Sequence, residues 1–263
     1  MVGENLLHTM VKTNDLESVL FLLSTQIDAT RVTIDGSKRS ALHYAADVDN
    51  ELILRNLILA GCDVDARATD GSTALHVAVR ANRPTHAEIL LENGANPNVV
   101  DDRSENALLA AVRCGSADCV RILISNSNVD GLAVNKNCQS ALHLCSMLTG
   151  EKVRPKSSPA EICDLLLRRE AGRLADKDFG AYVDLRDADG NTGKFEFFAT
   201  KYEQRNKQFT EDNLALLLAY MAGNGDVCRC LLRGGATMGA RNAEGATMFT
   251  YETPTRLLLF RLL

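Results

Sequence analysis

A short motif ending in histidine recurs along the chain at steps of about 33 residues. His43 and His143 each end Ser-Ala-Leu-His and His76 ends Thr-Ala-Leu-His, whereas Leu109, midway between the last two, ends Asn-Ala-Leu-Leu. A step of 35 residues back from His43 leads to His8. Self-similarity at a period of roughly 20 to 50 residues is the signature of proteins built from stacked repeats. The spacing therefore predicts a row of small units that share their core with their neighbours.

The stretch 70–101 shows what one unit contains. It opens on an Asp-Gly turn pair, and Thr73 is a residue type that caps the N-terminus of a helix. The apolar pattern predicts a first helix at 74–82 and a second at 85–93. Gly94 can take the left-handed conformation that closes the second helix.

Each unit resembles an ankyrin repeat. The Thr-Ala-Leu-His motif stands where the family has T-P-L-H, and "ILLENGANPN" matches the family's L-L-x-x-G-A-x-x-N. The resemblance implies an all-α ankyrin-repeat solenoid, in which helix-turn-helix repeats are joined by β-hairpin-like turns, as one domain over 1–263. The expected copies are a degenerate repeat at 1–35, repeats at 36–69, 70–101 and 102–136, a repeat with a long loop at 137–186, a repeat with an insert (193–214) at 187–244, and a truncated terminal cap at 245–263.

Two segments interrupt this pattern. The polar segment 149–161 holds two of the five prolines and is expected to be a loop. The phenylalanine-containing segment 193–214 separates a standard repeat lead from a standard first helix. We interpret it as an extra coding segment, and a functional docking peptide is the alternative. The chain stops at Leu263 within an apolar stripe, so we expect the natural protein to continue.

Composition argues against several classes of partner. The 29 basic and 34 acidic residues give a net charge of −5, which provides neither a basic face for nucleic acid nor a polybasic cluster for lipid. The N-terminus lacks the layout of a signal peptide, and no apolar run reaches the roughly 18 residues of a membrane helix. We expect a soluble, cytoplasmic chain that does not insert into a membrane.

The eight cysteines do not form a zinc or disulfide framework. No C-x-x-C pair is present to start a zinc site. Cys163 and Cys228 each precede a Leu-Leu pair, in an apolar helical position where a small thiol packs well. We expect all of them to be reduced packing residues.

No catalytic pattern stands out. His143 and Cys145 are two residues apart on an expected helix and would point about 200° apart, so they cannot act as base and nucleophile. Neither a G-x-x-x-x-G-K-[ST] loop nor an H-E-x-x-H motif occurs. We predict no catalytic, cofactor-binding or metal-binding residue in this chain, no small-molecule substrate and no nucleic-acid partner. In the ankyrin family the motif histidine bonds within and between turns, which implies a structural role for His8, His43, His76 and His143.

A binding module of this kind uses its turn tips and the exposed face of its first helices. Charges there can select a partner with complementary charges. The residues predicted to bind protein are Tyr44, Asp47, Asp49, Arg67, Asp70, Arg80, Asn82, Asp101, Asp102, Arg103, Glu105 and Arg113, with Lys136 at a further tip. We expect alanine at both Arg80 and Arg113 to weaken partner binding without loss of stability.

The C-terminal part carries a narrower resemblance. The runs "DADGNT", "LLLAYMAGNGDVCRCLLRGGATMGARNAEG" and "SALHLCSMLTGEKVRPKSSPAEICDLLL" resemble the last repeats of the rabankyrin family, the endosomal proteins with ankyrin repeats and a FYVE domain. That family implies a scaffold in endocytosis and macropinocytosis that binds an active early-endosomal Rab GTPase and lies peripheral to early endosomes. It also implies an upstream BTB domain, and zinc only in a downstream FYVE finger. The alternative is a generic cytosolic adaptor in transcriptional or ubiquitin-ligase complexes.

Overall fold

The computed structural model describes residues 5–25, 27–148, 158–172, 216, 219 and 224–236. The chain divides into two compact units, Met1–Asp130 and Gly131–Leu263. The described residues form helices with isolated β-bridges and no extended strand. Among these helices, none is long and apolar enough to cross a membrane.

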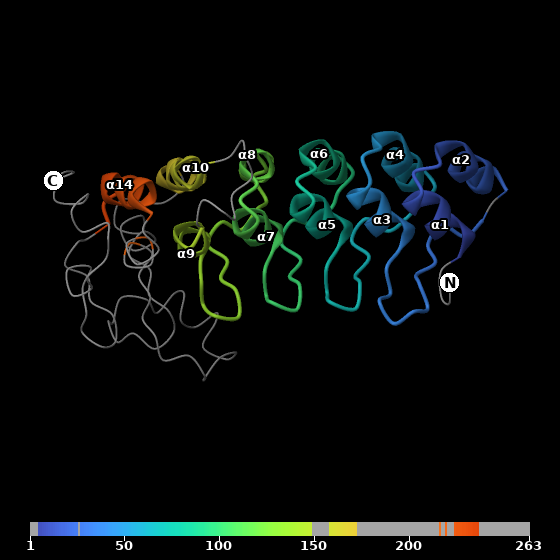
Figure 1. Cartoon of the computed structure of the whole chain (residues 1–263), viewed down its shortest axis with the longest axis horizontal. Coiled ribbons are helices and arrows are strands. Elements are labelled where there is room, and N and C mark those ends of the chain that lie inside the picture. Colours follow the sequence, from blue (N-terminus) through green and yellow to red (C-terminus); the bar gives the residue numbers. More distant parts are fainter. Residues whose placement is uncertain are drawn as a thin grey trace. The chain divides into compact units, whose positions relative to one another are not determined.

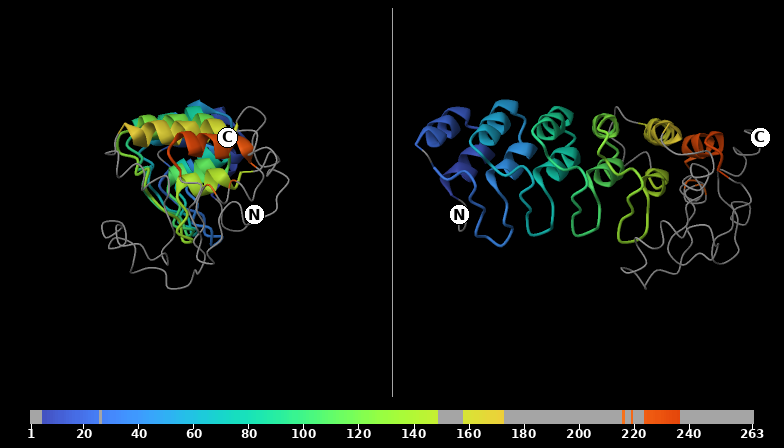
Figure 2. Two further views of the ribbon diagram at one scale, coloured as in Figure 1. Left: turned by 90° about the vertical axis from the view of Figure 1, so that its left-hand side faces the viewer. Right: turned by 180° about the vertical axis from the view of Figure 1, so that it is seen from behind.

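The first unit consists of four helix pairs. Its helices are α1 (Leu6–Lys12), α2 (Leu16–Ser24), α3 (Ala41–Asp47), α4 (Glu51–Leu59), α5 (Ala74–Arg80), α6 (Pro84–Glu92), α7 (Ala107–Arg113) and α8 (Ala117–Ser125). The short helices α1, α3, α5 and α7 pack side by side as one layer, and the longer helices α2, α4, α6 and α8 form a second layer above them (Figures 1 and 2). We call these the inner and the outer layer.

Residue size explains why the inner helices lie so close together. Ala45, Ala78 and Ala111 occupy the same position in successive inner helices, and each is completely buried. A methyl side chain lets two helices approach closely without leaving a void. The outer layer is filled instead by large aliphatic residues such as Leu57 and Leu90, both fully buried. Each pair therefore completes its core only against the next pair.

Gly94 ends α6 as its sequence suggests. Its φ of 86° is the left-handed conformation that glycine adopts without strain. The N–H of Gly94 donates to the carbonyl of Leu91, and the N–H of Ala95 donates to the carbonyl of Leu90. These two bonds satisfy carbonyl groups that the helix end leaves open.

Hairpin-like loops lead from each outer helix to the next inner helix. We call the loops at 31–40, 66–73 and 99–106 the first, second and third finger. Neighbouring fingers are joined by main-chain hydrogen bonds: the N–H of Thr69 donates to Ser37 O at 2.8 Å, and the N–H of Asp102 donates to Asp70 O at 2.9 Å. The fingers of the first unit thus form a bonded row below the helices (Figure 1).

In the second unit the described helices are α9 (Ala141–Ser146), α10 (Pro159–Ala171) and α14 (Gly225–Arg233), which pack on one another. Helix α10 starts at Pro159, inside the loop expected up to residue 161, because proline is suited to the first turn of a helix. The thiol of Cys145 donates to the carbonyl of Pro159 at 3.1 Å, and all eight cysteines are free thiols. The insert 193–214, the terminal cap 245–263 and the loop residues 149–157 lie outside the described residues.

Candidate functional site

The motif histidines His43 and His76 connect consecutive repeats. The Nε2 atom of His43 lies 3.0 Å from Ser72 O, and that of His76 lies 3.0 Å from Glu105 O, each at the base of the next finger. In His76, Nδ1 accepts from the N–H of Thr73 at 3.2 Å, so the proton must reside on Nε2, which donates to the carbonyl. One neutral imidazole therefore caps its own helix and bonds to the following repeat.

In repeat four an asparagine, and not a histidine, caps the first helix and bonds to a residue that follows the second helix. With Leu109 in place of histidine, Asn106 caps α7 by accepting from the N–H of Leu109 at 2.9 Å. The amide of Asn106 also donates to Asp130 O at 3.0 Å. The sequence contained the signal, an asparagine at the cap position together with leucine in place of histidine, but Asn106 was not among the predicted residues.

The first and last motif histidines, His8 and His143, also cap helices. The N–H of Asn5 donates to Nδ1 of His8, and the N–H of Ser140 donates to Nδ1 of His143, both at 3.3 Å. Both imidazoles are buried. His8, His43, His76 and His143 therefore each occupy the third position of the first helix of a repeat, and each bonds to the residue that precedes that helix.

The histidines predict how stability depends on pH. Burial lowers the pKa of His43, His76 and His86 below the ordinary 6.5. Between the folded and the unfolded pKa the unfolded chain binds more protons than the folded chain. The contribution of these histidines to the free energy of unfolding is therefore full above pH ~6.5 and decreases as the pH drops below it. We expect urea midpoints measured by circular dichroism to decline from pH 7 to 5.5. The control is Thr73→Asn with His76→Leu, whose decline should be shallower; an equal decline would contradict the prediction.

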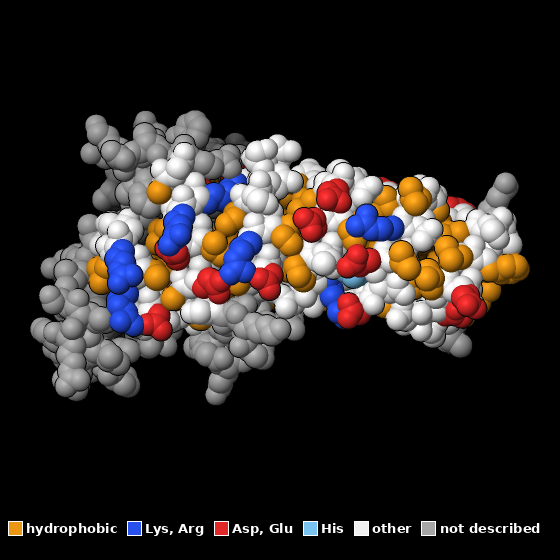
Figure 3. Space-filling model, turned by 90° about the horizontal axis from the view of Figure 1, so that it is seen from above, with side chains coloured by type: hydrophobic (Ala, Val, Ile, Leu, Met, Phe, Trp, Pro, Cys, Tyr) orange, Lys and Arg blue, Asp and Glu red, His pale blue; other side chains and the backbone are white. Residues whose placement is uncertain are grey.

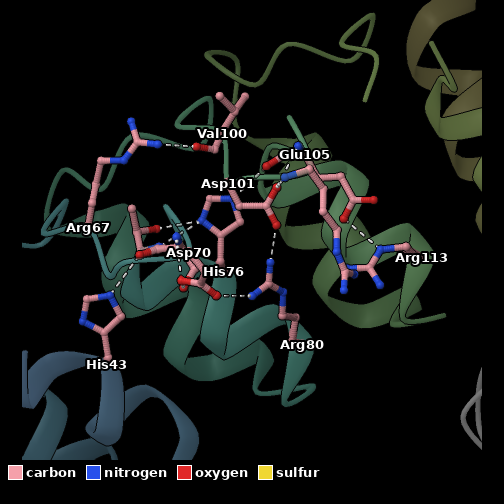
Figure 4. Close-up of polar contacts among 12 residues, drawn as sticks. His43, Arg67, Asp70, His76, Arg80, Val100, Asp101, Glu105 and Arg113 are labelled. Carbon is pink, nitrogen blue, oxygen red and sulfur yellow. Dashed lines mark hydrogen bonds and ion pairs between the residues drawn. The ribbon is translucent and has the colours of Figure 1, made fainter. Parts of the chain in front are cut away.

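Arg80 bridges two fingers (Figure 4). It is the last residue of α5, and its guanidinium forms an ion pair with Asp101 in the third finger and lies 3.8 Å from the carboxylate of Asp70 in the second. The other oxygen of Asp101 accepts from the N–H of Arg103 at 2.8 Å and from that of Glu105 at 3.0 Å. Asp101 thus holds the third finger in its turn through these two hydrogen bonds, and Arg80 pairs with the carboxylate of Asp101.

Glu105 is a junction of three kinds of contact (Figure 4). Its carboxylate accepts from Nε of Arg113 at 2.8 Å, its carbonyl accepts from His76, and its N–H donates to Asp101. Arg113 ends α7 as Arg80 ends α5. Repeats three and four are therefore joined by one continuous polar network.

Two residues predicted at exposed tips are in fact buried. Asp101 is 6% and Glu105 2% exposed, because each turns inward to bond finger amides or an arginine. A buried carboxylate left without its cation is strongly destabilising. This geometry argues against the expectation that Arg80 and Arg113 can be replaced without loss of stability. Replacement of either arginine is instead expected to lower the free energy of unfolding.

Other predicted residues are accessible to a partner. Asp102 and Arg103 are exposed at the tip of the third finger, and Asp47 is exposed at the end of α3. Asp70 is also exposed. The exposed Arg67 donates to the carbonyl of Val100 at 2.7 Å, so its side chain braces the third finger.

Tyr44, the predicted residue nearest the N-terminus, has two cationic side chains near its ring. Tyr44 is half-buried, with the ammonium of Lys12 4.3 Å and the guanidinium carbon of Arg39 6.0 Å from its ring centroid. The face of an aromatic ring attracts cations. The remaining members are Asp49, which pairs with Arg83 at 2.8 Å, Asn82, which has a positive φ of 55°, and Lys136, which is exposed in the second unit.

The site consists of polar contacts between repeats and of exposed charges. The histidines make neutral hydrogen bonds and the buried carboxylates are paired with arginines, so these groups hold the repeats in place. Within the described ranges no three His, Cys, Asp or Glu side chains come together to hold a metal ion. What faces solvent is a row of charged fingertips and charged ends of inner helices.

Comparison with solved structures supports the fold. The human ASB11 ankyrin repeat domain matches with a TM-score of 0.68 at 20% sequence identity, covering 98% of this chain and 98% of that one. At that identity the likeness concerns the fold alone. It agrees with the all-α repeat architecture expected from the sequence.

Sequence relatives point to the same architecture. Rabankyrin-5 from human and from mouse are each 37% identical over 261 residues, which is 99% of this chain and 19% of the relative. The chain thus spans about a fifth of these proteins. A glycerophosphocholine phosphodiesterase of Schizosaccharomyces pombe is 37% identical over 122 residues, 46% of this chain and 11% of that protein. Family models for ankyrin repeats, described as three copies and as many copies, match residues 7–101 and 90–145. With the histidine-linked helix pairs, these matches establish that the chain belongs to the ankyrin-repeat family.

Proposed function

We propose that this chain is a non-enzymatic protein-binding scaffold in endosomal trafficking, and that it binds an active early-endosomal Rab GTPase. The observation that carries the proposal is the 37% identity to rabankyrin-5 along 99% of the chain. The proposed setting is the cytoplasmic side of early endosomes, within endocytosis and macropinocytosis.

The binding surface in this proposal is formed by the fingertips and the adjoining ends of the inner helices. Asp47, Asp102 and Arg103 are exposed there, and no described ion pair engages their side chains. Exposed charges at the rim of an interface act mainly on partner choice and association rate. Tyr44 adds an aromatic side chain of the type that anchors interfaces.

A capture experiment tests the proposal. Immobilised chain is presented with purified early-endosomal Rab GTPases loaded with a GTP analogue or with GDP, and binding is measured by surface plasmon resonance. We expect binding of the GTP-loaded form only. Asp102→Lys with Arg103→Glu should weaken it roughly tenfold, since both charges are reversed where a partner would contact them.

The matched control is Glu88→Lys with Glu92→Lys, which reverses two exposed charges on the outer face of α6. It should leave binding unchanged, and both variants should keep the melting temperature of the unmodified chain. Absence of binding to any Rab, or equal binding of both nucleotide states, would contradict the proposal. The alternative of a generic cytosolic adaptor would then be favoured.

A further inference from the structure

The outer helices can be compared position by position, because α2, α4, α6 and α8 each contain nine residues. The second, fifth and ninth positions are exposed in all four helices. In α6 and α8 these positions hold only polar residues, namely Thr85, Glu88, Glu92, Asp118, Arg121 and Ser125. Exposure at these positions is therefore compatible with a fully polar surface.

The first two repeats depart from this rule. Leu52 and Leu59 occupy the second and ninth positions of α4, and Leu20 occupies the fifth position of α2. They are 55%, 83% and 41% exposed, so a large part of each side chain faces solvent. Figure 3 looks onto the outer layer and shows apolar side chains gathered over α2 and α4. We call Leu20, Leu52 and Leu59 the leucine patch.

Charges of both signs surround the leucine patch. Arg55 lies on α4 between Leu52 and Leu59, and Glu17 and Glu51 lie at the starts of α2 and α4. All three are exposed, and none forms an ion pair with any residue that the structure describes. A face that docks on a copy of itself across a two-fold axis must carry both partners of each contact. The patch carries leucines to meet leucines, an arginine between two of them, and two glutamates at the helix starts, which together meet this requirement.

The geometry points to a self-association site: we propose that the leucine patch docks on the leucine patch of a second copy of this chain, with Arg55 of one copy opposite Glu17 and Glu51 of the other. Such pairing removes apolar surface from water and places opposite charges next to one another. The patch lies on the outer layer, whereas the fingertips lie at the far edge of the inner layer (Figure 1). Self-association would therefore leave the proposed partner-binding surface open.

Sedimentation velocity of the full chain at increasing concentration tests this proposal. We expect a reversible dimer. Leu52→Thr with Leu59→Glu, which installs the residues that α6 has at these positions, should weaken dimerisation more than tenfold. The control is the reversal of Glu88 and Glu92 on α6, which should leave it unchanged. Thermal melts show that each variant is folded.

A charge exchange distinguishes docking on a second copy from other associations. Arg55→Glu makes all three charges acidic, and Glu17→Arg with Glu51→Arg makes all three basic. Each variant alone should be monomeric, and an equimolar mixture should recover the dimer. A chain that stays monomeric at every concentration would overturn the proposal. So would a dimer insensitive to the leucine substitutions, or one that the mixture fails to restore.

Discussion

His76→Ala is expected to lower the free energy of unfolding by about 3 kcal/mol. The imidazole is 1% exposed and bonds on both sides, to the N–H of Thr73 and to the carbonyl of Glu105. Alanine leaves a cavity and two buried polar groups without their partner. The loss is measured from urea unfolding followed by circular dichroism. Affinity for a partner, measured on the protein that remains folded, should change little.

The matched control for this prediction comes from repeat four. Thr73→Asn with His76→Leu installs the cap of α7, where Asn106 bonds the N–H of Leu109 and an apolar side chain fills the slot. This variant should recover a substantial part of the lost stability. If His76→Ala were as stable as the unmodified chain, the histidine would not hold the two repeats together.

Arg80→Ala is expected to lower the free energy of unfolding by about 2 kcal/mol. The side chain of Asp101 is 3% exposed and would lose the cation that now faces it. The cost lies below that of a fully buried pair, because 28% of the Arg80 side chain is in contact with solvent. Urea unfolding at pH 7 measures the difference, and Arg103→Ala, which removes an exposed arginine two residues from Asp101, is the control.

A second substitution isolates the cause. Asp101→Asn keeps an oxygen that can accept from the amides of the finger, as Asn135 does for Asn137 and Gln139. In Arg80→Ala with Asp101→Asn no buried charge is left unpaired, so most of the stability should return. A loss below about 0.5 kcal/mol for Arg80→Ala alone would show that the ion pair contributes little.

The repeats could be recognised from the sequence because the spacing of a motif is visible without knowledge of how side chains pack. The spacing of His43, His76 and His143 predicted the succession of helix pairs. In repeat three the predicted helices 74–82 and 85–93 agree with α5 and α6 to within two residues at each end. Burial of Asp101 and Glu105 was missed for a different reason. Register alone places both in a turn, whereas their burial depends on arginines at the ends of α5 and α7, whose reach is set by packing.

The hydrogen bonds between fingers have a mechanical consequence. Because Asp102 is bonded to Asp70 and Thr69 is bonded to Ser37, a pull on the third finger is passed to the second and then to the first. A macromolecule that pulls on a single tip therefore loads three repeats at once, because the displacement of one finger is resisted by the fingers bonded to it.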